Sequence, residues 1–364
     1  MTGVFAGVPG VVVDDDRVQH FGNPFAEQRA LVGGRAVAVL EDRAALAVTG
    51  EDRLSWLDSI SSQALTGLAP GVSTELLVLD PQGRVEHAAA VIDDGVTTWL
   101  IVDRGDAAPL LEWLRRMRFR LRVDPQEASG LIVLGATDAG VHLLPAAAPA
   151  HVPLVWRDPW PQVAPGGVGY ADAADHPGAE RSWNEVLVTT ADAEALAAAA
   201  IAGEIALAGA VAADALRVAA WRPRWAAEND ERLIPHEVDW LRTAVHLDKG
   251  CYRGQETVAK VHNLGHPPRR LVALHLDGSD DVLPAPGDPV EIDGAVVGAI
   301  TSVARHHEDG PIALALVKRS AGVEVDAVVR TAGGEVAASV RTVVPADAGA
   351  AASVPRLPRL SRRR

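Results

Sequence analysis

The sequence predicts an α+β fold in which a region of mixed helices and strands is followed by a small C-terminal β-barrel. The chain has 364 residues, of which 48% are hydrophobic and 23% charged, an ordinary globular composition that allows two or three domains. Its first part alternates strand-like and helical patterns, whereas its last part contains short apolar runs separated by Asp-Gly and proline-rich turns. Closely spaced short strands of this kind are typical of a small barrel or sandwich.

We expect four parts along the chain. Residues 1–33 are expected to be irregular, because scattered glycines and prolines and a run of aspartates interrupt them. The mixed α/β region is expected over 34–266 and the barrel over 267–345, with the boundary near Pro267. Residues 346–364 are expected to form a disordered basic tail, because arginines dominate the charge at this end.

In the mixed region, apolar residues recur at the periods of strands and helices. A hairpin is expected at Asp94-Gly95, because Asp-Gly between two apolar runs favours a tight turn. A proline-rich connection is expected at 145–169. The expected strands are 36–40, 75–80, 84–92, 96–102, 119–123, 131–134 and 183–188, and the expected helices are 54–60, 106–114, 191–202, 211–220 and 236–245.

The expected barrel strands follow in quick succession. Turn signals such as Asp277-Gly278 and Asp293-Gly294 separate them. The strands are expected at 270–276, 290–292, 295–304 and 312–317.

Composition excludes several classes of protein. The net charge of −14 argues against a surface that binds nucleic acid over most of its extent. No run approaches the roughly 20 apolar residues that a membrane span requires, and no secretory signal is visible at the N-terminus. One cysteine supplies no disulfide framework. We therefore expect a cytoplasmic protein that has no membrane partner.

The common cofactor motifs are missing. The sequence has no P-loop and no dinucleotide-binding fingerprint. His262 and His266 have the spacing of two ligands on one helix, but Gly265 and Pro267 argue against a helix at that point. We predict no metal site.

The single cysteine, Cys251, lies in a segment rich in special residues, Lys249–Glu256. A lone thiol cannot form an internal disulfide or, unaided, a multi-cysteine metal site. Gly250 and Gly254 allow a tight bend, and the cations Lys249 and Arg253 favour a thiolate. The alternative is a buried cysteine that acts as a small hydrophobic residue.

Two further residues are candidates for ligand binding. Glu185 lies in an otherwise apolar strand, so it is either on an exposed face or placed to accept hydrogen bonds from the N–H/NH₂ edge of a ring such as a pterin or guanine. Arg217 lies on an alanine-rich helix and either pairs with an anionic ligand or is a solvated surface arginine.

The segment 249–256 resembles the Lys-Gly-Cys-Tyr-x-Gly-Gln-Glu signature of the YgfZ family of folate-binding proteins connected with iron–sulfur enzymes. That family is similar in turn to the aminomethyltransferase (T-protein) of the glycine cleavage system. The resemblance extends to an early strand–helix element, a first hairpin, a Leu-Arg-x-x-Ala helix and the C-terminal domain. These segments are 48–54, 79–85, 216–220 and 297–302.

The resemblance implies an aminomethyltransferase-like folate-binding fold and a role in assembling or repairing iron–sulfur enzymes, including enzymes that modify tRNA. It implies tetrahydrofolate or a derivative as cofactor, together with a transient iron–sulfur cluster shared with a partner. The implied partners are folate and iron–sulfur client or assembly proteins, with an indirect link to tRNA. Cys251 would be the reactive or cluster-bridging thiolate. The implied cofactor-binding residues are Glu185, Arg217, Lys249, Gly250, Tyr252, Arg253, Gly254, Gln255 and Glu256.

The sequence departs from the aminomethyltransferase pattern at two places. Those enzymes carry Gly-Gly-Ile-x-Asp-Asp in the first hairpin, where an aspartate is catalytic, but here the run ends in His87-Ala88. The Leu-Arg-x-x-Ala helix is followed by Trp221 where a glycine is usual. Two alternatives stay open: a folate-dependent one-carbon transferase in which His87 is the base, and a folate-binding scaffold that does no chemistry.

Overall fold

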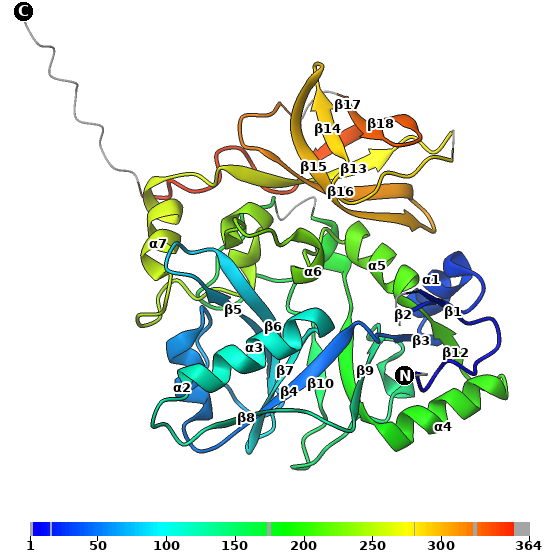
Figure 1. The fold of residues 1–364 in the computed structure, drawn as a ribbon, viewed down its shortest axis with the longest axis vertical. Helices are drawn as coiled ribbons and strands as arrows, with labels where there is room; N and C mark the ends of the chain where they lie inside the picture. Colours follow the sequence, from blue (N-terminus) through cyan, green and yellow to red (C-terminus); the bar gives the residue numbers. More distant parts are fainter. Residues whose placement is uncertain (1–2, 15–16, 173–175, 280, 323–325, 353–364) are drawn as a thin grey trace, which may run out of the picture.

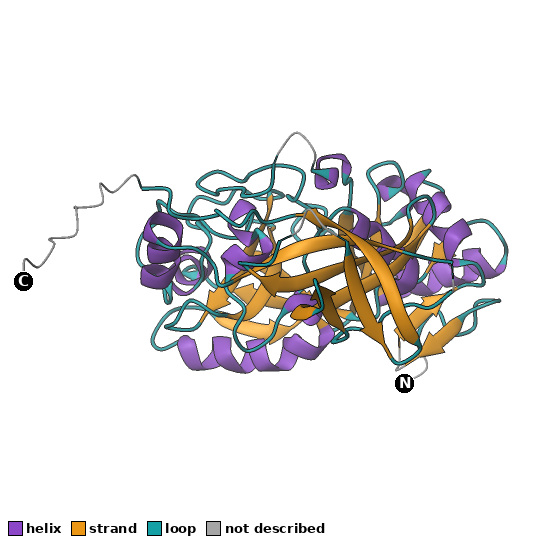
Figure 2. Cartoon of the chain, turned by 90° about the horizontal axis from the view of Figure 1, so that it is seen from above, coloured by secondary structure: helices purple, strands orange, loops and turns teal. Residues whose placement is uncertain are grey.

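The computed structural model describes residues 3–14, 17–172, 176–279, 281–322 and 326–352. Two five-stranded sheets lie below a closed six-stranded barrel in the view of Figure 1. Seen from above, the strands lie centrally and most helices lie at the periphery (Figure 2).

The first sheet is antiparallel and carries the expected hairpin. Its strands run in the order β5(Ser73–Leu79), β6(Val85–Asp93), β7(Thr97–Asp103), β4(Arg43–Thr49) and β8(Asp124–Glu127). Gly95 has a φ of +93° at the turn between β6 and β7, a conformation that glycine adopts without steric cost. The helices α2(Arg53–Ile60) and α3(Arg104–Met117) cover one face, where Trp56 and Leu114 pack against Leu100.

The second sheet has one parallel pair. Its order is β10(Val155–Arg157), β11(Asn184–Thr189), β9(Leu131–Ala136), β3(Ala36–Val39) and β12(Ala206–Ala208), and β12 runs parallel to β3. Helix α4(Thr190–Ile201) packs on one face through Leu196, and α5(Ala210–Ala219) packs on the other through Ala212. Strand β3 is buried on both faces, and its sequence is therefore a continuous apolar run.

The barrel confirms the predicted C-terminal strands. Its strands are β13(Arg269–Leu276), β14(Pro289–Ile292), β15(Ala295–His306), β16(Gly310–Lys318), β17(Ala327–Thr331) and β18(Gly334–Thr342), closed in the order β13-β16-β15-β14-β17-β18. Side chains alternate along β13: Val272 and Leu274 lie in the barrel core, whereas Leu271 and Ala273 pack against the mixed region. Because both faces are used, the barrel is fixed on the rest of the protein.

The N-terminal segment is not irregular, contrary to prediction. It contains β1(Val12–Asp14), β2(Arg17–His20) and α1(Pro24–Val32). The Asn23 side chain accepts hydrogen bonds from the N–H groups of Phe25 and Ala26 at the start of α1, and Pro24 lies at the first helical position. An asparagine followed by proline is a helix-start signal, and the glycines and prolines around it obscure the signal.

Other predictions need correction. Residues 119–123 form no strand but a bend in which Phe119 has a φ of +45°, and strand β8 follows them. The proline-rich connection contains the short strand β10. The prediction also lacks strands β4, β12, β17 and β18. The remaining helical elements are the 3₁₀ turns Val141–Leu143 and Pro177–Glu180, the helix α6(Trp225–Glu228) and the helix α7(Gln255–Leu264).

The predicted helix 236–245 is replaced by two 3₁₀ turns, Pro235–Val238 and Trp240–Arg242. Asp239, between them, has a φ of +58°, which an α-helix cannot contain. Its carboxylate accepts hydrogen bonds from the Tyr170 N–H and from Arg242 Nε. The apolar pattern here reflects burial rather than helical periodicity.

The start of the predicted tail is ordered where the structure describes it. The N–H groups of Ala351 and Ala352 donate to the carbonyl oxygens of His262 and Asn263 on α7. The arginines of the predicted basic tail, from Arg356 onward, lie outside the described residues. Within the described ranges no helix has the length and apolar character needed to cross a membrane.

Candidate functional site

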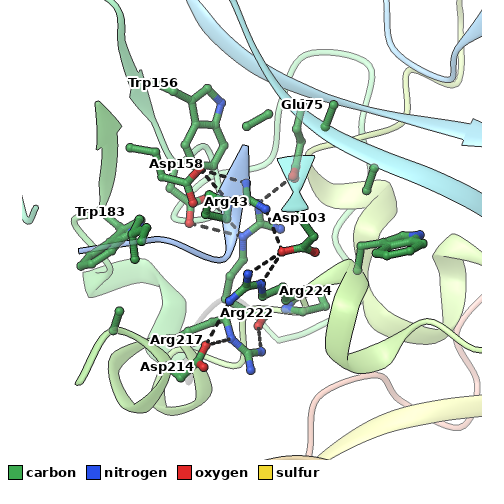
Figure 3. A pocket seen from close by; sticks show the side chains of 18 of the residues that line it. Arg43, Glu75, Asp103, Trp156, Asp158, Trp183, Asp214, Arg217, Arg222 and Arg224 are labelled. Atoms are coloured by element: carbon green, nitrogen blue, oxygen red, sulfur yellow. Dashed lines mark hydrogen bonds and ion pairs between the residues drawn. The ribbon is translucent and has the colours of Figure 1, made fainter. Parts of the chain in front are cut away.

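A polar cavity of about 90 Å³ lies between the two sheets and the segment after α5 (Figure 3). We name it the central cavity. Strands β4, β5, β7 and β11 supply Arg43, Glu75, Asp103 and Glu185, and helix α5 supplies Asp214 and Arg217. Loops supply Asp158, Arg181, Arg222 and Arg224, and Trp156, Trp183, Trp225 and Trp240 give it aromatic walls.

The charged residues of the central cavity balance one another. Five arginines and five carboxylates line it, and each takes part in at least one ion pair. Buried charges are tolerated only when they are paired and hydrogen-bonded, so the network is the condition for placing so many charges here. The residues come from segments far apart in the sequence, which the fold brings together.

One half of the network is built around Asp158. Its Oδ2 accepts a hydrogen bond from Arg181 Nε at 2.7 Å, and its Oδ1 lies 3.2 Å from Arg222 Nε. Arg222 Nη2 donates in turn to Glu75 Oε2 at 2.6 Å. Burial acts to raise the pKa of Asp158, but the charges of Arg222 and Arg181 outweigh it and hold the pKa below its usual value.

The other half is built around Asp103. This buried carboxylate accepts hydrogen bonds from Arg224 Nε at 2.6 Å, from Arg43 Nη1 at 3.1 Å and from the Ala226 N–H at 2.9 Å. Arg43 also donates through Nε and Nη2 to Glu185 Oε2, at 3.1 and 2.9 Å. Burial acts to raise the pKa of Asp103, and Arg224 and Arg43 lower it below the usual value.

Both single candidates from the sequence, Glu185 and Arg217, line the central cavity. Glu185 is only 8% exposed, so the exposed-face alternative is wrong. Arg217 is also buried: its Nη1 donates to the Arg222 carbonyl oxygen and its Nη2 donates to Ser302 Oγ on the barrel, both at 2.9 Å. It is not a solvated surface residue, and it connects α5 to the barrel.

The wall that β6 contributes to the central cavity has no carboxylate. It consists of Ala88, Ala89 and Ala90. His87 instead lines a separate outer cleft of about 620 Å³ beside α3, together with Glu86 and Trp113. Its Nδ1 lies 2.6 Å from Oδ1 of the buried Asp106, and burial raises the pKa of that carboxyl. The hairpin histidine therefore does not replace a cavity carboxylate.

None of the residues 249–256, which we call the signature loop, lines the central cavity. Cys251 is a free, exposed cysteine, so the buried-cysteine alternative is wrong. The two flanking cations are engaged elsewhere: Lys249 Nζ forms an ion pair with Asp58 at 3.5 Å, and Arg253 Nη1 donates to Glu86 Oε2 at 2.6 Å. Both cations thus pair with carboxylates outside the segment 249–256.

Most other positions of the signature loop fix its shape. Gly254, at the start of α7, has a φ of +85°, and a Cβ there would lie 2.6 Å from the Asp80 carbonyl oxygen. Gln255 Nε2 donates to the Lys249 carbonyl oxygen at 3.3 Å, and Tyr252 is buried beneath Lys249. Gly250 faces open space and Glu256 is exposed. These contacts fix part of the loop backbone and leave the Cys251 thiol exposed.

The sequence reasoning missed the ion-pair partners in the cavity. Arg43 and Asp103 lie at the ends of apolar strands, and Arg222 and Arg224 flank Pro223 in a short segment. A charged residue within an apolar strand was the signal that identified Glu185, and Arg43, the first residue of the apolar strand β4, could have been identified in a similar way. Among the described residues, no three His, Cys, Asp or Glu side chains form a metal-binding group.

Comparison with known proteins fits this architecture. Residues 269–347 match the family model of the glycine cleavage T-protein C-terminal barrel domain. The crystal structure of the glycine cleavage system aminomethyltransferase T from Bartonella henselae superposes with a TM-score of 0.68 at 17% identity, covering 88% of this chain and 89% of that chain. The chain therefore has the T-protein fold.

Two curated relatives match over shorter stretches. An aminomethyltransferase of Streptomyces avermitilis is 33% identical over 155 residues, which are 39% of this chain and 41% of that protein. A chloroplastic protein of Arabidopsis thaliana, named "Putative transferase", is 31% identical over 118 residues, which are 31% of this chain and 25% of that protein. The aligned parts thus span less than half of either relative.

The structure also explains the tryptophan that follows α5. Trp221 has a φ of +55°, the left-handed conformation that glycine adopts freely and bulky residues rarely do. The backbone therefore has the conformation that a glycine at this place would favour, although the side chain differs. Trp221 is buried, with its ring centroid 5.4 Å from that of His176. Packing holds the strained residue in place.

Proposed function

We propose that this protein binds a folate in the central cavity and, like the YgfZ family that its signature loop resembles, supports iron–sulfur enzymes in the cytoplasm. The observation that carries the folate proposal is Glu185, a buried carboxylate that lines the central cavity and already accepts two N–H groups from one planar cation. A pterin ring offers a similar pair of donors. Two of the proteins named above, from Streptomyces avermitilis and Bartonella henselae, are aminomethyltransferases.

The chemistry of the cavity lining fits a folate. Glu185 suits the donor edge of the ring, and Trp156 and Trp183 supply apolar wall. Arg222 Nη1 is a buried donor with no hydrogen-bond partner within the described residues. Such a group costs free energy until it is given an acceptor, and a ligand carbonyl or carboxylate would be one.

The volume of the cavity sets a condition on binding. Pockets for drug-sized ligands are typically about 300–1,000 Å³. The central cavity has about 90 Å³, which is below this range, so we expect a side chain of the lining to move when a ring binds.

The alanine wall on β6 favours binding over one-carbon transfer. A transfer that depends on a hairpin carboxylate lacks that group here, because Ala88–Ala90 occupy the wall and His87 lies in the outer cleft. The residues of this chain would hold and orient the folate. Tetrahydrofolate would supply the one-carbon or redox chemistry of its own ring when bound.

The folate proposal is tested by titrating the protein with tetrahydrofolate and following tryptophan fluorescence, since the chain has 9 tryptophans and four of them line the cavity. Glu185→Gln should weaken the affinity by about 10- to 100-fold, because hydrogen bonds to a charged group contribute roughly 1.5–3 kcal/mol. The exposed Glu194→Gln on α4 is the matched control and should bind as the unchanged protein does. Equal affinity of both variants would remove Glu185 from the binding site.

The iron–sulfur proposal concerns Cys251, whose exposure lets it reach a partner protein or a cluster carried by that partner. In cells without their own copy of this protein, Cys251→Ser should leave the activity of an iron–sulfur enzyme, such as a tRNA-modifying one, at least tenfold below that with the unchanged chain. The exposed Lys260→Gln is the control. Full restoration of activity by Cys251→Ser would contradict the iron–sulfur proposal. Folate binding should be the same in both variants.

A further inference from the structure

Arg43 occupies the position at Glu185 where the ligand would bind. We propose that Arg43 is an internal competitor of the ligand, and that a ring with adjacent N–H and NH₂ donors binds by exchanging with its guanidinium group at Glu185. This inference rests on the proposed folate site and goes beyond it by naming the residue that closes the site and the ligand edge that opens it.

The donor geometry of the two groups is similar. A guanidinium presents parallel N–H groups on a planar N–C–N unit, as Arg43 does with Nε and Nη2. A 2-amino-4-oxopyrimidine ring, the form found in pterin and guanine, presents a ring N–H beside an exocyclic NH₂ on the same kind of unit. Both Arg43 donors fall on Oε2 of Glu185, at 3.1 and 2.9 Å, so a ring cannot occupy this oxygen while Arg43 stays.

Arg43 also pairs with a second carboxylate, Asp103, and can keep this pair when it releases Glu185. Its Nη1 lies 3.1 Å from Asp103 Oδ1, and its Nη2 lies 3.4 Å from the Ile101 carbonyl oxygen. Burial acts to lower the pKa of Arg43, but Glu185 and Asp103 raise it above its usual value, so the side chain stays charged. The ion pair with Asp103 lets the guanidinium move away from Glu185 without becoming an unpaired buried charge.

The exchange also accounts for the size of the cavity. Arg43 lines a space of about 90 Å³, which is below the roughly 300–1,000 Å³ typical of ligand pockets. Moving its side chain toward Asp103 removes the competitor and enlarges the space in one step. A ligand that lacks the exocyclic amine would not offset the loss of the Arg43 hydrogen bonds, so the edge that displaces Arg43 also sets the specificity.

The experiment measures the tetrahydrofolate affinity of Arg43→Met, which keeps an unbranched side chain and removes the competing donors. We expect binding at least tenfold tighter than that of the unchanged protein. The exposed Arg29→Met on α1 is the matched control and should leave the affinity unchanged. The affinity of Arg43→Lys should lie between those of Arg43→Met and the unchanged protein, because lysine can still pair with Asp103 but lacks the planar guanidinium group. It serves as the readout should the methionine variant fold poorly.

Two further arms separate the outcomes. In a protein that already carries Glu185→Gln, adding Arg43→Met should not increase the affinity for tetrahydrofolate. A 2-oxo pteridine without the amine should not bind more tightly to Arg43→Met than to the unchanged protein. Unchanged or weaker binding by the Arg43 variants, with saturable binding by the unchanged protein, would overturn the exchange and leave the folate proposal standing. Absence of binding by every form would overturn both.

Discussion

Asp158→Asn is expected to lower the free energy of unfolding by about 3–5 kcal/mol, the usual cost of removing one member of a buried ion pair. Arg181 depends on Asp158, the carboxylate with which it forms its ion pair. Arg222 would keep its ion pair with Glu75 but lose its ion pair with Asp158. Asparagine preserves the volume of the side chain, so the loss would come from two buried guanidinium groups left with too little negative charge.

Denaturant unfolding at neutral pH measures this difference. The matched control is Glu112→Gln, which removes a carboxylate from the exposed 3.7 Å pair with Arg116 and should change stability no more than surface substitutions usually do. An equally small effect of Asp158→Asn would mean that the cavity charges are well hydrated and that the network does not hold the sheets together.

The difference in stability between the unchanged protein and Asp158→Asn should depend on pH. The pKa of Asp158 is lower in the folded than in the unfolded protein, so its contribution to stability is complete above the unfolded value of about 3.9. This contribution is lost as the pH falls from that value through the lower pKa of the folded protein. The difference between the unchanged protein and Asp158→Asn should therefore narrow in acid.

The parts of the fold that sequence predicts are those with a local cause. Four of the six barrel strands were predicted because Asp-Gly and proline-rich turns separate their apolar runs, whereas β17 and β18 were not predicted. Strands β6 and β7 were predicted because Gly95 permits the turn that joins them. The segment 235–245 was misassigned because it is buried on every side, so its apolar residues carry no period. Burial alone does not separate a helix from two 3₁₀ turns around a left-handed Asp239.

The site shows the same division between local and distant causes. Glu185 could be identified because a carboxylate in an apolar strand stands out, whereas its partner Arg43 lies 142 positions away in the chain. Arg222 and Glu75 are 147 positions apart. No spacing rule connects such residues, because the fold brings them together. The signature loop is a different case: its residues predict ligand contacts, and the contacts that the structure shows are those that fix the loop around the exposed Cys251.

Lys249→Met tests that structural interpretation of the signature loop, and we expect it to lower the free energy of unfolding by about 3 kcal/mol. The Lys249 side chain is only 3% exposed. Its Nζ donates to the carbonyl oxygens of Ser61 at 3.0 Å and Gln63 at 2.7 Å, and also to that of Asp58. Methionine keeps the apolar stem but leaves these acceptors and the Asp58 carboxylate without their common donor.

Tetrahydrofolate affinity decides between the structural and the ligand-binding role of Lys249. Because Lys249 does not line the central cavity, the folded Lys249→Met protein should bind tetrahydrofolate as the unchanged protein does, measured well below its unfolding temperature. Lys260→Met, an exposed lysine on α7, is the control for both measurements. Lost affinity with unchanged stability would mean that Lys249 contacts the ligand, as the sequence suggested. Lost stability with unchanged affinity would mean that the signature's lysine anchors the loop to the 58–63 segment.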